Sequence, residues 1–173
     1  MSKPDSTNKQ SPDQQQSHEQ EWFDLPDPTG TTNTGETGLR FTCTQCGNCC
    51  TGPTGFVLFT DDEAQAIANE LKITKDAFYA DYTRDTPIGR SLNETEIEGY
   101  GFDCVFLTRD EAGKTGCSVY GSRPEQCRTW PFWRSNLTGK RAWNRETRGC
   151  PGMNVGELHT PAHIRITRDR VEI

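Results

Sequence analysis

Apolar residues recur every three or four positions in the stretch that begins at residue 60. The segment Thr60-Asp61-Asp62-Glu63 fits a capping box, in which Thr and the Glu three residues later satisfy the first backbone amides of a helix. The apolar residues that follow share one helix face by their spacing: Ala64, Ile67, Ala68 and Leu71. The pattern predicts an amphipathic helix that packs against a core.

Two further helices are indicated by the same kinds of signal. Thr74 is a second helix start, and the apolar stripe behind it ends before Pro87 and consists of Ala77, Phe78 and Tyr82. Near the C-terminus, Thr160-Pro161 predicts the start of a last helix that runs to about residue 170. The alternation of Ile164 and Ile166 would suit a strand equally well, so both interpretations stay open there.

Short apolar runs at residues 104–107 and 117–120 flank a turn-rich segment and predict a hairpin-like pair of strands. Residues 123–128, with Pro124 near their start, predict a single helical turn. Helices and strands together predict an α+β fold that is small and irregular and forms a single domain. Only 31% of the residues are hydrophobic, so the core is expected to be small. A cross-link such as a bound metal is expected to stabilise it.

The first 38 residues differ from the rest of the chain. They carry most of the net charge of -6 and are rich in Gln, Ser, Pro, Asp, Gly and Thr, which predicts a disordered acidic tail (1–38) ahead of the domain (39–173). Trp22-Phe23 with Leu25 forms an apolar island that could dock on the core or on a partner. An incidental solvated cluster is the commoner case for such islands.

The sequence has no run of about 18 apolar residues, which a membrane-spanning helix needs, and its first residues lack the apolar stretch of a secretory signal. A soluble, cytoplasmic protein without a membrane partner is therefore expected. Eight cysteines in that compartment favour metal binding or redox chemistry over disulfides. A secreted disulfide scaffold is the residual alternative.

Four of the cysteines fall within eight residues, Cys43-Thr44-Gln45-Cys46-Gly47-Asn48-Cys49-Cys50. A CxxC turn brings two thiolates within reach of one metal, and Gly47 permits the positive φ that such a turn often needs. Cys49 and Cys50 are neighbours whose side chains are expected to diverge, so one of them would serve a second site or lie in the outer shell of the first. The remaining candidate ligands are spread singly along the chain: Cys104, Cys117, Cys127 and Cys150.

Eight thiolates allow two four-thiolate sites, or one cluster with spare thiols. Structural zinc usually draws on two separated pairs, whereas a CxxCxxC run completed from afar is typical of iron-sulfur loops. The spacing therefore favours an iron-sulfur cluster, of the 4Fe-4S type, over zinc. Arg123 or Arg128 could offset the negative charge of either centre.

These motifs resemble the YkgJ-type cysteine-cluster family, which is described as zinc- or iron-chelating. The resemblance rests on the order and spacing of the cysteines from Phe41 to Gly152, together with the flanking Arg123-Pro124 and Pro131-Phe132. It covers about residues 39–152 and includes all eight cysteines. The resemblance implies metal chelation by those cysteines. It implies no assigned reaction, so an iron-sulfur redox or radical enzyme acting on an unknown substrate is kept as an alternative.

A basic stretch with interleaved aromatics suggests a third class of function, a module that binds nucleic acid or an acidic partner. Its basic residues are Arg123, Arg128, Arg134, Lys140, Arg141, Arg145 and Arg148. The tryptophans among them are equally needed as core, and the sequence pI of about 5.1 argues against general DNA binding. His159 and His163 have i, i+4 spacing, but a solvent-exposed helical pair is the expected interpretation.

Overall fold

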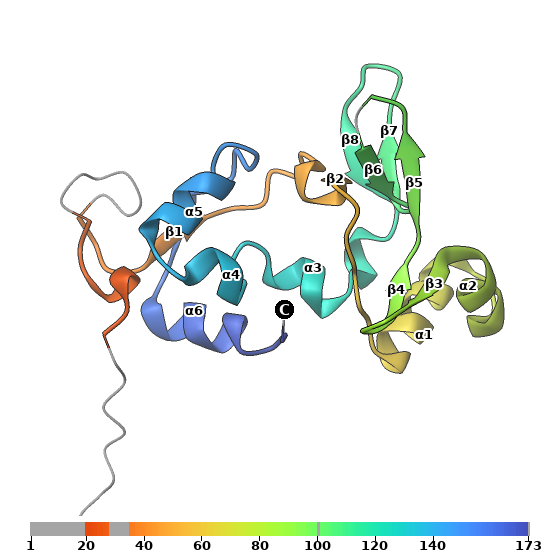
Figure 1. The fold of residues 1–173 in the computed structure, drawn as a ribbon, viewed down its shortest axis with the longest axis horizontal. Coiled ribbons are helices and arrows are strands. Elements are labelled where there is room, and N and C mark those ends of the chain that lie inside the picture. Colours follow the sequence, from red (N-terminus) through yellow and green to blue (C-terminus); the bar gives the residue numbers. More distant parts are fainter. Residues whose placement is uncertain (1–19, 28–34, 100, 173) are drawn as a thin grey trace, which may run out of the picture.

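The computed structural model describes residues 20–27, 35–99 and 101–172. It contains helices and strands in one small unit, and the predicted α+β class is confirmed (Figure 1). The disorder predicted for residues 1–19 and 28–34 lies outside the described residues.

The helices are short, and three of them are single 3-10 turns. They are η1 (Trp22–Asp24), η2 (Asn48–Cys50), α1 (Asp61–Leu71), α2 (Lys75–Tyr82), η3 (Tyr120–Ser122), α3 (Glu125–Thr129), α4 (Arg134–Leu137), α5 (Lys140–Glu146) and α6 (Pro161–Arg168). The strands are β1 (Leu39–Phe41), β2 (Thr51–Gly52), β3 (Thr83–Thr86), β4 (Gly89–Leu92), β5 (Glu94–Ile97), β6 (Gly101–Cys104), β7 (Leu107–Arg109), β8 (Thr115–Cys117) and β9 (Met153–His159).

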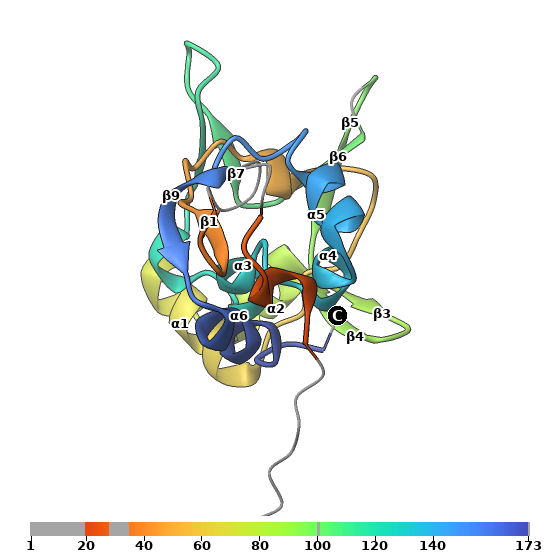
Figure 2. The ribbon, with the colours of Figure 1, turned by 90° about the vertical axis from the view of Figure 1, so that its left-hand side faces the viewer.

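The strands of the described residues form four small antiparallel sheets. Three of the pairings are hairpins between consecutive strands: β3 with β4, β5 with β6, and β7 with β8. In addition β2 adds to the β5–β6 hairpin, and β1 lies beside the distant β9 (Figure 2). A protein built from such short sheets needs further contacts between them, and the side-chain clusters supply these.

The capping box that the sequence predicts forms as expected at α1. The Thr60 side chain accepts the Glu63 amide at 3.2 Å, and the Glu63 carboxylate accepts the Thr60 amide at 2.8 Å. Thr74 caps α2 in the same way, because its hydroxyl accepts the Ala77 amide at 3.1 Å. Both predicted helix starts are confirmed.

The apolar faces of α1 and α2 pack into one of two hydrophobic clusters. This central cluster consists of Ala64, Ile67, Ala68, Phe78, Leu92, Phe106 and Val119. The aromatic rings stack within it: Phe78 and Phe106 have centroids 6.5 Å apart, and Tyr82 lies 5.3 Å from Phe106. The helices and the chain around Phe106 are thereby fixed to one another.

The second cluster joins the two ends of the described chain. This terminal cluster consists of Phe23, Leu39, Phe132, Leu137, Trp143, Cys150, Met153 and Ile164. Ile164 is fully buried in α6, whereas Ile166 is 61% exposed. In a strand these two residues would lie on the same face and be buried or exposed together. Their different exposure fits the helix that the segment forms.

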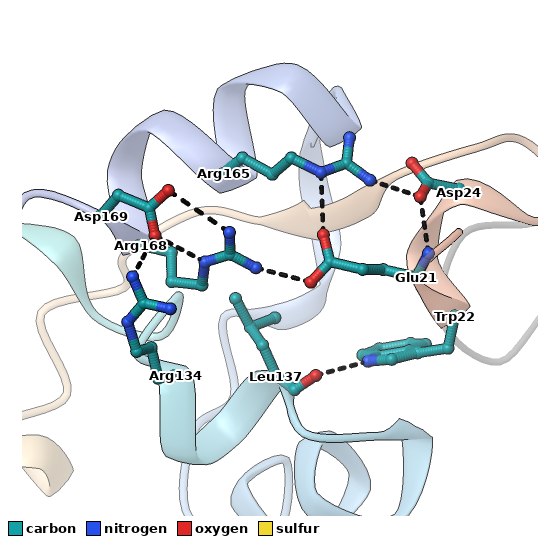
Figure 3. Close-up of polar contacts among 8 residues, drawn as sticks. All are labelled: Glu21, Trp22, Asp24, Arg134, Leu137, Arg165, Arg168 and Asp169. Atoms are coloured by element: carbon teal, nitrogen blue, oxygen red, sulfur yellow. Dashed lines mark hydrogen bonds and ion pairs between the residues drawn. The ribbon is translucent and has the colours of Figure 1, made fainter. Parts of the chain in front are cut away.

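The segment around Trp22, which precedes the predicted domain start at residue 39, packs against the terminal cluster. Phe23 is fully buried. The Trp22 indole donates to the Leu137 carbonyl at 2.8 Å, and Glu21 accepts from Arg165 at 2.8 Å (Figure 3). The apolar island is thus part of the core. The alternative interpretation of this island as an incidental solvated cluster is wrong, because Phe23 is buried.

The network in Figure 3 ties the same segment to α6 and α4. Arg165 also pairs with Asp24, while Arg168 pairs with Glu21 and with Asp169. Asp169 in turn accepts from Arg134 at 2.7 Å. The hydrogen bond from Arg168 holds the pKa of the Asp169 carboxyl below its ordinary value.

The predicted hairpin exists, but its strands lie closer to the turn than expected. The pairing runs from Leu107 opposite Cys117 to Arg109 opposite Thr115, so residues 118–120 are outside it. Cys104 ends β6, the preceding strand. In the described residues, no helix has both the length and the apolar character needed to span a membrane.

Candidate metal centre

Most of the cysteines surround one pocket between the two hydrophobic clusters. Cys150 is part of the terminal cluster, whereas Cys104 and Cys117 pack against the central cluster. In Figure 1 the segment from β1 to β2 runs from α5 and α6 across to the β5–β8 strands. The pocket there is lined by six cysteines: Cys43, Cys46, Cys49, Cys50, Cys117 and Cys150.

The loop that carries four of these cysteines turns sharply at Gly47. This glycine has φ of 72°, as the sequence predicts, and the Cys50 amide donates to its carbonyl at 2.8 Å. A Cβ at this position would lie 2.8 Å from Leu107 and Thr115. The loop therefore packs directly on the β7–β8 hairpin, and only glycine satisfies both the φ and the space.

Two hydrogen bonds hold the cysteine loop to the other pocket walls. The Asn48 amide donates to the Gly149 carbonyl at 2.7 Å, beside Cys150. On the opposite side, the Thr115 hydroxyl donates to the Gln45 carbonyl at 3.4 Å. These contacts bring cysteines from distant parts of the sequence into one place.

The sulfurs of Cys49 and Cys50 lie 3.8 Å apart. The expectation that these neighbouring side chains diverge is therefore wrong, because the 3-10 turn η2 brings both to the same side. Two thiolates on one tetrahedral ion, with metal-sulfur distances of about 2.3 Å, lie about 3.8 Å from each other. The pair has the separation of two ligands of a single ion.

Three more thiols lie close to this pair. Burial raises the pKa of Cys104 to about 11, and burial followed by the charges of Cys104, Cys49 and Cys117 raises the pKa of Cys127. Cys104 also lines an adjoining pocket together with Cys49 and Cys50. Thiols that raise one another's pKa share a region where negative charge is costly, and a bound cation offsets that cost.

Arg123 is the cation that faces this group. Its guanidinium stacks on the Tyr120 ring at 3.6 Å, its Nε donates to the Tyr120 carbonyl at 3.0 Å, and it lines the cysteine pocket. A hydrogen bond from Cys50, aided by Arg123, lowers the pKa of the Cys49 thiol to about 7. Arg128, the other candidate, pairs with Glu125 at 2.7 Å instead.

The donor set fits a thiophilic metal. All eight cysteines are free thiols, so the disulfide-scaffold alternative finds no support here. Within the described ranges, no three Cys, His, Asp or Glu side chains already stand in a geometry that would hold one ion. Chelation therefore requires the pocket cysteines to rotate toward a common centre. The cysteines would then supply the thiolate ligands that zinc ions and iron-sulfur clusters take.

The family model "CxxCxxCC: Putative zinc- or iron-chelating domain" matches residues 42–151, more than half of the chain. The chain belongs to the CxxCxxCC family. All eight cysteines lie inside the match, and the resemblance carried by their spacing is confirmed. Membership of the CxxCxxCC family supports metal chelation by the cysteines, with zinc or iron as the metal. No solved structure matches the chain.

The basic stretch that suggested nucleic-acid binding uses its aromatic residues differently in this CxxCxxCC protein. Trp143 is fully buried and Phe132 is 3% exposed, so neither can stack on a base. Lys140 pairs with Asp27 at 2.6 Å, and Arg134 pairs with Asp169. The pattern of basic and aromatic residues is thus largely explained by the core and by ion pairs.

The two histidines do not form the helical pair that was expected. His159 ends β9 and its Nε2 lies 2.9 Å from the Phe41 carbonyl, whereas His163 is an exposed residue of α6. Their ring centroids are 5.0 Å apart. In the CxxCxxCC domain described here they belong to the β1–β9 junction and not to the cysteine pocket.

Sequence reasoning missed two contributors to the pocket, Tyr120 and Trp130. Tyr120 was taken as part of a strand, and Trp130 as one of the aromatic residues of the basic stretch. The signal that could have found them is their position within the family match, where each lies three residues after a cysteine.

Proposed function

We propose that the protein binds a metal centre through its cysteine thiolates at the junction of the two hydrophobic clusters. The observation that carries this proposal is the convergence of six cysteines from distant segments on one pocket. Ionisation of thiols that raise one another's pKa is costly unless a cation is held there. The family assignment points to the same chemistry.

The mutual effects of the thiols suggest how the ligands are divided. The inner set would comprise Cys50, Cys104, Cys117 and Cys127, because burial and neighbouring thiols act together on these positions. The outer set would comprise the remaining pocket cysteines: Cys43, Cys46, Cys49 and Cys150. The vicinal pair Cys49 and Cys50 then contributes one thiolate to each set.

The CxxCxxC spacing supports an iron-sulfur cluster, of the 4Fe-4S type, as the form of the centre. In such a cluster each thiolate binds its own iron. Zinc is the second candidate, because eight thiolates in two sets of four match the four ligands that each of two zinc ions takes. Either centre would stabilise a fold whose core is small.

The test is elemental analysis of anaerobically purified protein, combined with its absorption spectrum. Iron with an equal amount of acid-labile sulfide and a broad band near ~400 nm would support the cluster. Zinc at one or two ions per chain without colour would support the zinc centre, where about four thiolates hold each ion. Protein that is folded but holds neither metal, and takes up neither on reconstitution, would contradict the proposal.

Substitution of single ligands tests the division into two sets. Cys127→Ser and Cys46→Ser should each reduce the metal content and lower the melting temperature, since each removes a thiolate from a different set. Ser118→Ala is the control, because it removes an exposed hydroxyl next to Cys117 and should leave the metal content unchanged. Full metal content in both cysteine variants would argue against these residues as ligands.

A further inference from the structure

Trp130 has a buried indole N–H without a hydrogen-bond partner in the described part of the chain. Leaving such a donor unsatisfied is unfavourable, so each case asks for an explanation. Trp130 also lines the cysteine pocket. The residue with the unsatisfied donor therefore belongs to the site where negative thiolates are expected.

The other three tryptophans all have partners for their indole N–H groups. Trp22 donates to the Leu137 carbonyl at 2.8 Å, and Trp143 donates to Asn154 at 2.7 Å. Trp133 donates to the Gln126 carbonyl at 3.0 Å. Three of the four indole N–H groups therefore donate to protein acceptors, and the Trp130 N–H does not.

The position of Trp130 is fixed by its surroundings. It is the C-cap residue of α3, three residues after Cys127, and its ring packs edge-to-face on Trp133 with centroids 4.9 Å apart. It also packs against the terminal cluster. A ring held in this way cannot readily turn its buried N–H to solvent.

We propose that Trp130 is a positioning residue of the metal centre, whose indole N–H donates a hydrogen bond to a metal-bound thiolate sulfur in the cysteine pocket. This rests on the proposed metal-binding function. A hydrogen bond to a charged acceptor is stronger than one to a neutral group, and outer contacts of this kind orient metal ligands and tune the centre. The donor that the protein alone leaves unsatisfied would be satisfied when the centre is loaded.

The test compares Trp130→Phe with Trp22→Phe in zinc-bound and metal-free protein. Zinc affinity is measured by competition with a chromophoric chelator. Trp130→Phe should weaken zinc binding by about tenfold, whereas Trp22→Phe should change it by less than about twofold. Both variants replace an indole that packs against the terminal cluster, but Trp22 lines neither cysteine pocket, so the comparison separates the pocket hydrogen bond from a general loss of packing.

A second readout follows the indole N–H itself by NMR. In ¹⁵N-labelled wild-type protein, the resonance that disappears in Trp130→Phe belongs to Trp130. Addition of zinc should move this resonance downfield and slow its exchange with water, while the Trp22 resonance stays in place. The variant is needed only to assign the resonance, and the response to zinc is measured on the wild-type protein.

The outcomes separate the two proposals. If wild-type protein binds neither zinc nor iron, the proposed function fails. If the wild type binds zinc but the Trp130 resonance does not move and both variants bind zinc equally well, the metal centre stands and the role of Trp130 is overturned. A selective loss in Trp130→Phe with a shifted indole resonance supports the inference.

Discussion

A single glycine determines how the cysteine loop approaches the rest of the pocket. Gly47 needs its positive φ of 72°, and its missing Cβ leaves room for Leu107 and Thr115 of the adjacent hairpin. Gly113, at the tip of that hairpin, has a similar φ of 78° but nothing within 4 Å. The two glycines therefore share a backbone requirement and differ in crowding.

This difference gives a matched pair of substitutions. Gly113→Ala should lower the free energy of unfolding by about 1–2 kcal/mol, the cost of a left-handed alanine, and should leave metal content unchanged. Gly47→Ala should cost more and should also reduce the metal content, because the loop must move away from the hairpin. Urea unfolding and elemental analysis measure both effects. Equal costs and equal metal contents would show that the crowding at Gly47 is unimportant.

At the residue scale, the sequence allowed the prediction of residues that belong to short motifs with characteristic spacing. Gly47 and the four clustered cysteines from Cys43 to Cys50 were singled out because CxxC turns and their glycines are local features, and the ligand role of these cysteines stays a prediction. The role of Trp130 could not be found in that way, since it depends on which of four tryptophans lacks a partner after folding. The convergence of Cys49 and Cys50 was missed because a 3-10 turn was not expected there.

At the scale of elements, helices were predicted better than strands. Thr60 and Thr74 mark the starts of their helices, because each side chain accepts a hydrogen bond from the backbone amide three residues later. The β1–β9 pair has no comparable signal, because Leu39 lies opposite His159 at the other end of the domain. Such pairing is decided by tertiary contacts and not by local preference.

The short segment around η1 was the element most underestimated. Its sequence is surrounded by polar residues, which predict disorder, yet one fully buried ring and several ion pairs to α6 hold it in place. Composition averages over a window and so does not detect a single anchor residue. The anchor here is Phe23, and Arg165 covers its ring at 5.3 Å.

Truncation of this anchor tests the docking. Phe23→Ala should lower the free energy of unfolding by about 3–5 kcal/mol, as expected for a buried aromatic residue. Leu25→Ala, two residues away and 49% exposed, should change it by about 1 kcal/mol or less. Thermal or urea unfolding measures both. If the two variants are equally stable, the η1 segment contributes nothing to the fold.

At the scale of the whole molecule, the cysteine pocket joins two hydrophobic clusters that are each small. Cys150 is a member of the terminal cluster, and Cys117 packs against the central one. The loop from Cys43 to Cys50 contributes thiolates to both proposed sets, so metal held by the two sets would connect the two clusters. Ligand binding to the native state alone stabilises it by about 4 kcal/mol at a thousandfold excess over the dissociation constant.

Removal of the metal should therefore affect both clusters together. After treatment with a chelator, amide exchange should accelerate at Ile67 in α1 and at Ile164 in α6, both fully buried, and the melting temperature should fall. Hydrogen exchange with and without metal measures this. Exchange that accelerates only in the loop from Cys43 to Cys50 would mean that the metal organises its own loop and does not connect the clusters.

The distribution of the cysteines along the chain also sets an order of events during synthesis. The thiols of Cys43 to Cys50 leave the ribosome first, while Cys127 and Cys150 follow much later. A nascent chain that has not yet reached Cys150 can present an incomplete ligand set only. The centre can therefore be completed only after Cys150 has been synthesised, and a product that terminates before this residue would lack both the last thiolate and the helix α6 that contacts the N-terminal segment.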